Sequence, residues 1–182
     1  MESIVNSIMK SLQGLFRMLA VLAGVIALLA VLNWLPSLSQ KDYARRFQNM
    51  DEAKKAAGLA TALIPAYFPE GISWPPSFIV AQRRPYQALV AEYSDAASER
   101  TSLVVIQASS SEVSKQLQRI RFRDISQRTE YLLKGRSAIL SVGTCEDTVC
   151  SELNWREGDA YYCVLYKSSP FELIKVAESM IR

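Results

Sequence analysis

The sequence predicts an α+β fold, with one N-terminal transmembrane helix followed by a curved antiparallel sheet with flanking helices. Three observations predict it. An uncharged apolar run occupies residues 18–35, segments with a hydrophobic period of two fill the middle of the chain, and helical patterns lie on either side of them. We therefore divide the 182 residues into four parts: a short N-terminal segment 1–14, a transmembrane helix 15–35, a helical linker 36–64 and an extracytoplasmic α+β domain 65–182.

The apolar run "MLAVLAGVIALLAVLNWL" has Asn33 as its one polar side chain. About 20 helical residues span the hydrocarbon core of a bilayer, so the run predicts a single membrane span. Arg17 and Trp34 at its ends suit the two interfaces, and Pro36 ends the helix. A cleaved signal peptide is the alternative, although the apolar region is long for one.

Small residues recur on one face of this expected helix at steps of three and four. Such a stripe lets helices approach closely in lipid, which predicts a docking face for another membrane protein. The alternative is that alanine is simply common in membrane helices. The residues of the stripe are Ala20, Ala23, Gly24, Ala27 and Ala30.

The next elements follow from helical spacing and then from prolines. A helix is expected from about Gln40, broken near Gly58, and the proline-rich stretch from Pro65 to Pro76 predicts an extended connector. Beyond it the strands "SFIVAQRR", "YQALVAEYS" and "TSLVVIQAS" precede the helical turn "SSSEVSKQLQ". "RIRFRDI" predicts a further strand, and "EYLLKGRSAILSVG" a hairpin around Gly135.

The C-terminal part predicts a hairpin about Glu157-Gly158 and a final helix capped by Ser169, with Pro170 in first position. This hairpin sets Trp155 opposite Ala160, Leu153 opposite Tyr162 and Cys163 opposite Glu152. The core face is then Leu153, Trp155, Ala160, Tyr162 and Val164, covered by Phe171, Ile174, Ala177 and Ile181. The other face holds Glu152, Asn154, Tyr161 and Cys163.

The segment "CEDTVC" raises three alternatives for Cys145 and Cys150: a metal clip, a redox pair or a structural disulfide. A zinc clip needs about four ligands, and a thioredoxin-like pair needs CxxC at a helix start. If the segments flanking the turn pair antiparallel, the cysteines fall opposite each other at ~5 Å, within disulfide range. We therefore expect a disulfide with Cys163 free; a Cys150–Cys163 bridge is the alternative if the register differs.

Composition excludes several classes of function. With no histidine, the chain can form neither a histidine-based nucleophilic site nor a His-ligated metal site, and no motif indicates a cofactor. The net charge of +3 is too small to indicate a nucleic-acid partner. We predict a non-enzymatic protein without cofactor or metal.

The arginines Arg119, Arg121 and Arg123 alternate with Ile120 and Phe122. This alternation is typical of a half-buried strand with a solvated face. The functional alternative is contact with an acidic partner or with anionic lipid headgroups.

Two stretches carry a resemblance to a known family. "MDEAKKAAGLATALIPAYFPEG" and "LNWREGDAYYCVLYKSSPFELIKVAESM", together with "GRSAIL" between them, resemble an uncharacterised extracytoplasmic domain found at the C-terminus of membrane-anchored anti-sigma-factor-like proteins. That domain is similar in plan to periplasmic lipoprotein carriers, which wrap a curved antiparallel sheet around helices. The resemblance covers roughly residues 50–182 and implies an exported, bacterial domain that binds a ligand or partner.

From these observations we expect a non-catalytic accessory or scaffolding subunit of a membrane protein complex, single-pass in the inner membrane with its C-terminal domain in the periplasm. Its partners would be membrane proteins and lipid. The alternative is an envelope signalling or carrier module that binds a lipid or peptide. Positive residues after the apolar run favour a cytoplasmic domain, whereas a disulfide favours export.

Overall fold

The computed structural model describes residues 18–30, 44–59 and 62–181. The described residues from 44 onward belong to one compact unit, and the helix at 18–30 belongs to another. The expected N-terminal segment 1–14 and the first part of the expected linker, residues 36–43, lie outside the described residues.

The predicted fold class is wrong in its transmembrane helix. In the ranges that the structure describes, no helix is both long and apolar enough to cross a membrane. The described helix within the predicted span contains residues 18–30. The described chain is instead an eight-stranded antiparallel sheet accompanied by four helices, including the one at 18–30.

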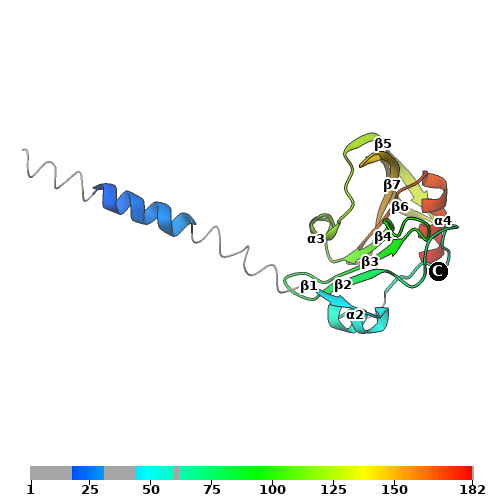
Figure 1. The fold of residues 1–182 in the computed structure, drawn as a ribbon, viewed down its shortest axis with the longest axis horizontal. Helices are drawn as coiled ribbons and strands as arrows, with labels where there is room; N and C mark the ends of the chain where they lie inside the picture. The colour runs from blue at the N-terminus through cyan, green and yellow to red at the C-terminus, as the bar shows by residue number, and fades with distance from the viewer. Residues whose placement is uncertain (1–17, 31–43, 60–61, 182) are drawn as a thin grey trace, which may run out of the picture. The chain divides into compact units, whose positions relative to one another are not determined.

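The sheet has the strand order β1-β2-β3-β4-β8-β7-β6-β5, and every neighbouring pair is antiparallel (Figure 1). Because β4 pairs with β8, the chain leaves the sheet centre after β4 and returns to it through the β5–β8 meander. The strands are β1 (Ala44–Phe47), β2 (Phe78–Gln82), β3 (Ala88–Ser94), β4 (Thr101–Ala108), β5 (Asp124–Leu133), β6 (Arg136–Cys145), β7 (Thr148–Glu157) and β8 (Ala160–Tyr166).

Three helices cover the sheet, namely α2 (Met50–Ala57), α3 (Ser111–Leu117) and α4 (Pro170–Met180). Asn49 caps α2 by accepting a 2.8 Å hydrogen bond from the Glu52 amide, and Gly58 ends it at φ 71°. Ser110 caps α3 in the same way, accepting from the Val113 amide. As expected, Ser169 precedes α4 and Pro170 opens it.

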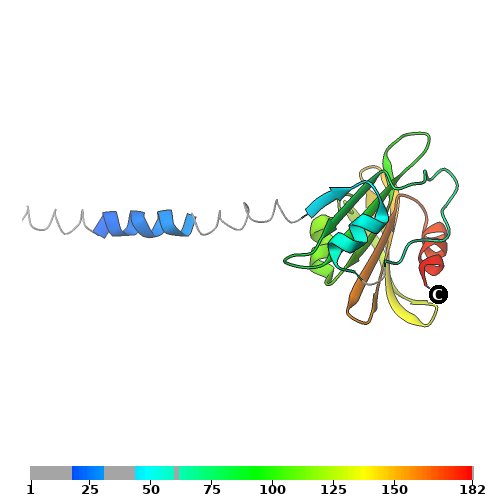
Figure 2. The ribbon, with the colours of Figure 1, turned by 90° about the horizontal axis from the view of Figure 1, so that it is seen from below.

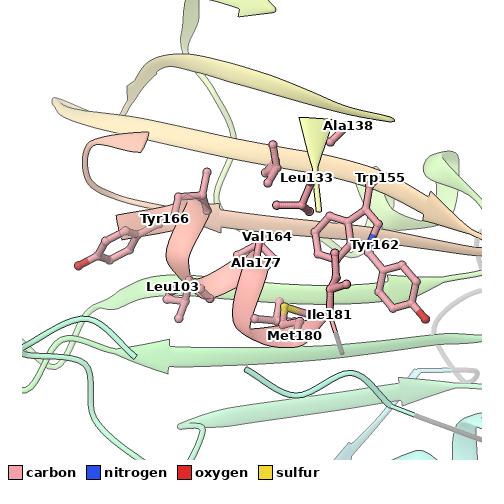
Figure 3. Close-up of a cluster of buried hydrophobic side chains, with 14 of the residues drawn as sticks. Leu103, Leu133, Ala138, Trp155, Tyr162, Val164, Tyr166, Ala177, Met180 and Ile181 are labelled. Carbon is pink, nitrogen blue, oxygen red and sulfur yellow. The ribbon is translucent and has the colours of Figure 1, made fainter. Parts of the chain in front are cut away.

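Helices α3 and α4 lie on opposite faces of the sheet (Figures 1 and 2). We call the face under α4 the core face; its cluster includes Leu153, Trp155, Val164 and, from α4, Leu173 and Val176. Figure 3 shows α4 lying across these strands, with Ala177, Met180 and Ile181 directed at them. The face under α3 we call the α3 face, and its buried cluster is smaller.

The segment from residue 44 to 57, expected in a helical linker, contributes β1 and α2 to the sheet unit. Ala53 and Ala57 of α2 are buried against Ile79, Ala81 and Leu89. The helix periodicity is therefore correct for α2, while residues 44–47 pair with β2 and form a strand.

The hairpin of β7 and β8 is displaced by two residues from the predicted register. Its two-residue turn is Gly158-Asp159, so Trp155 lies opposite Tyr162 and Leu153 opposite Val164. A displacement of two keeps every side chain on its face. Glu152, Asn154, Tyr161 and Cys163 thus share the α3 face as predicted, with Cys163 opposite Asn154 and not Glu152.

The final helix is rotated from the predicted orientation. Ala177 and Ile181 are buried as expected, but Phe171 is 75% exposed, and Leu173, Val176 and Met180 take the buried positions. The strand expected at "RIRFRDI", residues 119–125, begins only at Asp124. Residues 118–123 have no regular structure.

Candidate functional site

A pocket of about 470 Å³ opens on the α3 face, between α3 and strands β5 to β8. Its lining comes from alternate residues of the strands, because every second side chain of a strand points to the same face. On β6 these are Ser137, Ile139 and Ser141; α3 and the residue after it add Ser111, Ser114, Lys115 and Gln118. Glu152, Asn154, Arg156, Tyr161, Cys163, Ile125 and Arg128 complete the side-chain groups that we name the polar pocket.

A chain of hydrogen bonds organises one wall of the polar pocket. The Tyr161 hydroxyl donates to Oδ1 of Asn154 at 2.7 Å, and Nδ2 of Asn154 donates to Oε1 of Glu152. Nε2 of Gln118 donates to Oε2 of Glu152 at 2.8 Å. Both carboxylate oxygens of Glu152 are therefore engaged, and groups from α3, β7 and β8 hold one another in position.

Cys163 lies at the inner end of this wall and is 2% exposed. Burial raises the pKa of its thiol well above its usual value, and the negative charge of Glu152 raises it further, while a hydrogen bond with Ser114 opposes this. Burial also raises the pKa of Tyr161. Both groups are therefore neutral near pH 7 and serve as hydrogen-bonding groups, not as a nucleophile or base.

Three cationic side chains, Lys115, Arg128 and Arg156, line the polar pocket against the one carboxylate of Glu152. Most of the remaining lining side chains are hydroxyls and amides. Such a surface offers hydrogen bonds and positive charge to a bound molecule.

The three arginines named from sequence do not meet in one place. Nη1 of Arg119 lies 3.3 Å from Oε2 of the buried Glu92, and its guanidinium lies 4.8 Å from the ring centroid of Phe78. Arg123 lies 3.5 Å from Asp147, with both side chains exposed, and Arg121 is exposed. The buried and partly buried Ile120 and Phe122 between them confirm the expected alternation, although in an irregular segment.

Cys145 and Cys150 form a disulfide, as predicted, with their Cα atoms 5.7 Å apart. The two residues are not directly opposite, since Cys145 pairs with Thr148 and Cys150 with Gly143. Cys163 is free and buried. Because disulfides persist in oxidising compartments, this one fits a location outside the cytoplasm; anchoring in the inner membrane has no support in the described structure.

The small-residue stripe from Ala20 to Ala30 lies on the helix at 18–30, where every side chain is exposed. The lining of the polar pocket comes from residues 111–163, in the other compact unit. In the described ranges, no group of three or more His, Cys, Asp or Glu side chains could hold a metal ion.

The period of two in the sequence predicts that Glu152, Asn154, Tyr161 and Cys163 share one face, but it does not identify a site there. It does not show that Gln118, the residue after α3, reaches Glu152 across 34 positions of sequence. The signal that could have been used is the polar side chains at alternate positions of β7, Glu152, Asn154 and Arg156, where a buried face would be apolar.

Comparison of the chain with models of protein families, with characterised proteins and with solved structures found no match.

Proposed function

We propose that residues 44–181 form an exported, non-catalytic binding domain whose polar pocket takes a small hydroxylated organic acid. The observation that carries this proposal is the hydrogen-bonded wall of Gln118, Glu152, Asn154 and Tyr161 beside three cationic side chains. Its geometry is fixed before any ligand arrives, which lowers the entropic cost of binding.

The ligand class follows from the charges and polarity of the lining. A carboxylate on the ligand is attracted by Lys115, Arg128 and Arg156, and its hydroxyls match the serines and amides. An acyl chain would leave these polar groups desolvated without partners. Of the two functions that the sequence suggests, the ligand-binding module is therefore favoured, with a hydrophilic ligand in place of a lipid.

The chemistry of the pocket supports a non-catalytic role. The chain has no histidine, and the raised pKa of Cys163 keeps its thiol protonated. Both carboxylate oxygens of Glu152 accept hydrogen bonds from side-chain amides. These groups are arranged to hold a molecule by hydrogen bonds.

The test is thermal melting of the full chain with glucuronate, glucose or octanoate as the probe. We expect glucuronate to raise the melting temperature, glucose to raise it less and octanoate to leave it unchanged. Ser137→Trp, an exposed position in the lining, should abolish the glucuronate shift by filling the pocket. Gln116→Trp, exposed on α3 outside the lining, is the matched control. A shift with octanoate alone would contradict the proposal.

A further inference from the structure

The two edges of the sheet differ in length. β1 forms one edge with four residues and β5 forms the other with ten, and among the described residues β5 pairs on one side only, with β6. Eight of the nine residues from Asp124 to Leu132 are exposed, and Tyr131 is partly buried, so the edge is accessible along most of its length. A long exposed edge is a template for pairing with another strand.

The register of the β5–β6 hairpin defines which backbone groups of β5 face outward. Leu133 and Arg136 flank the two-residue turn Lys134-Gly135, so they form a hydrogen-bonded pair. Odd-numbered residues from 127 to 133 then direct their backbone groups toward β6. Arg128, Glu130 and Leu132 direct theirs toward the free edge. The outward carbonyl of Glu130 accepts a long, 3.4 Å hydrogen bond from the Thr129 hydroxyl and keeps a lone pair for a partner.

We propose that β5 pairs antiparallel with β5 of a second copy of this chain, about a twofold axis at Thr129. In this register Arg128 lies directly opposite Glu130 of the second copy, and symmetry repeats the pair. Because both residues direct their backbone groups outward, each pair also exchanges backbone hydrogen bonds. The isologous contact would join two eight-stranded sheets into one.

Charge selects this register over its symmetric neighbours. With the axis moved by one residue to Arg128, that arginine would face its own copy, and with the axis at Glu130, two carboxylates would meet. Like charges directly opposite destabilise strand pairing, and opposite charges stabilise it. The β-bulge between Ile125 and Gln127 ends the straight part of the strand, which confines pairing to residues 127–133.

The proposal does not rest on the ligand of the polar pocket. Arg128 belongs to both the pocket lining and the β5 edge, whereas Thr129 and Glu130 do not line the pocket. Failure of either proposal would therefore leave the other unaffected, since the probes are a small acid in one case and a cross-link in the other.

The experiment is cysteine cross-linking of the full chain under mild oxidation. Thr129→Cys places two thiols across the axis in a non-hydrogen-bonded pair, where Cα atoms lie about 4.5 Å apart and a disulfide can form. Gln127→Cys, on the same strand, is the matched control, because the two copies of residue 127 would lie roughly 13 Å apart. We expect dimer from Thr129→Cys and none from Gln127→Cys.

Charge exchange completes the test. Adding Glu130→Arg to Thr129→Cys should lower the cross-linked fraction at least about five-fold, and adding both Arg128→Glu and Glu130→Arg should restore it. The restored variant also shows that loss of cross-linking did not come from misfolding. Equal cross-linking from positions 127 and 129, no cross-linking from either, or failure of the exchanged pair to restore it would overturn the proposal.

Discussion

Arg119 holds the carboxylate of Glu92, whose side chain is 1% exposed, by a 3.3 Å contact from Nη1 to Oε2, while its own side chain is 62% exposed. Thr101 donates a second hydrogen bond to Oε2. Oε1 is buried and has no hydrogen-bond partner within the described part of the chain. Burial raises the pKa of Glu92, and Arg119 partly opposes this.

Replacing Arg119 by Met is therefore expected to lower the free energy of unfolding by roughly 1–2 kcal/mol at pH 7, a modest value because Arg119 is mostly exposed. The substitution leaves the buried carboxylate of Glu92 without the cation beside it. Denaturant unfolding measures the effect, and in a Glu92→Gln background the same substitution should have little effect. An equal loss in both backgrounds would show that packing of Arg119 on Phe78 is the cause.

The raised pKa of Glu92 makes stability depend on pH. The folded protein binds the proton of Glu92 more tightly than the unfolded chain does, so protonation of Glu92 stabilises the fold. This stabilisation is fully present below the ordinary pKa of 4.5 and is lost as the pH rises through the higher pKa of the folded protein. Arg119→Met raises the folded value further. Its destabilisation should therefore be smaller at pH 4 than at pH 7, as melting curves at the two pH values would show. The opposite trend would contradict the assigned cause.

Gly143 of β6 lies close to the backbone of β5. A Cβ atom at this position would overlap the carbonyl oxygen of Asp124, beside the bulge of β5. Gly143→Ala is expected to destabilise the protein by about 1–3 kcal/mol, since the backbone of β5 must shift. Thr144→Ala, at the exposed neighbouring position, is the control and should change stability little in the same urea titration.

The disulfide closes a short loop, so its removal is expected to cost about 2 kcal/mol of stability. Reductant should lower the melting temperature of the wild-type chain and leave that of the Cys145→Ala/Cys150→Ala variant unchanged. Alkylation after unfolding without reductant should label one thiol, Cys163. Labelling of Cys145 in place of Cys163 would indicate the alternative Cys150–Cys163 bridge.

Burial of Cys163 predicts that its thiol is inert in the folded protein. With its pKa raised well above the usual range, the thiol stays protonated at pH 8 and should not react with a disulfide reagent. After unfolding in urea it should react at the rate of a free cysteine. Rapid reaction in the absence of urea would show that the α3 face opens, and would contradict the rigid wall proposed for the pocket.

The sequence predicts much of the sheet because a period of two and a period of 3.6 are local properties. The face shared by Glu152, Asn154, Tyr161 and Cys163 follows from that period alone, whatever the exact register. The register depends on which two residues form the turn. The predicted turn is Glu157-Gly158 and the observed turn is Gly158-Asp159, so every predicted pair differs from the observed one by two residues.

The pocket could not be predicted in the same way, because it depends on contacts between distant segments. Gln118 reaches Glu152 only once α3 has packed on β4 and β8, and periodicity does not specify where a helix of seven residues docks. The apolar composition of residues 15–35 predicts a membrane span, whereas no helix in the described part of the chain is long and apolar enough to cross a membrane. Apolar composition does not by itself establish a spanning helix.

The most direct test of the binding proposal is to follow the side-chain amide signals of Gln118 and Asn154 by NMR during titration of the full chain with glucuronate. These two amides form the pocket wall with Glu152, and Gln116 on the exposed side of α3 is an internal reference. The proposal predicts saturable shifts for Gln118 and Asn154 with no shift for Gln116. Unchanged signals for both pocket amides, or equal shifts for all three, would contradict it.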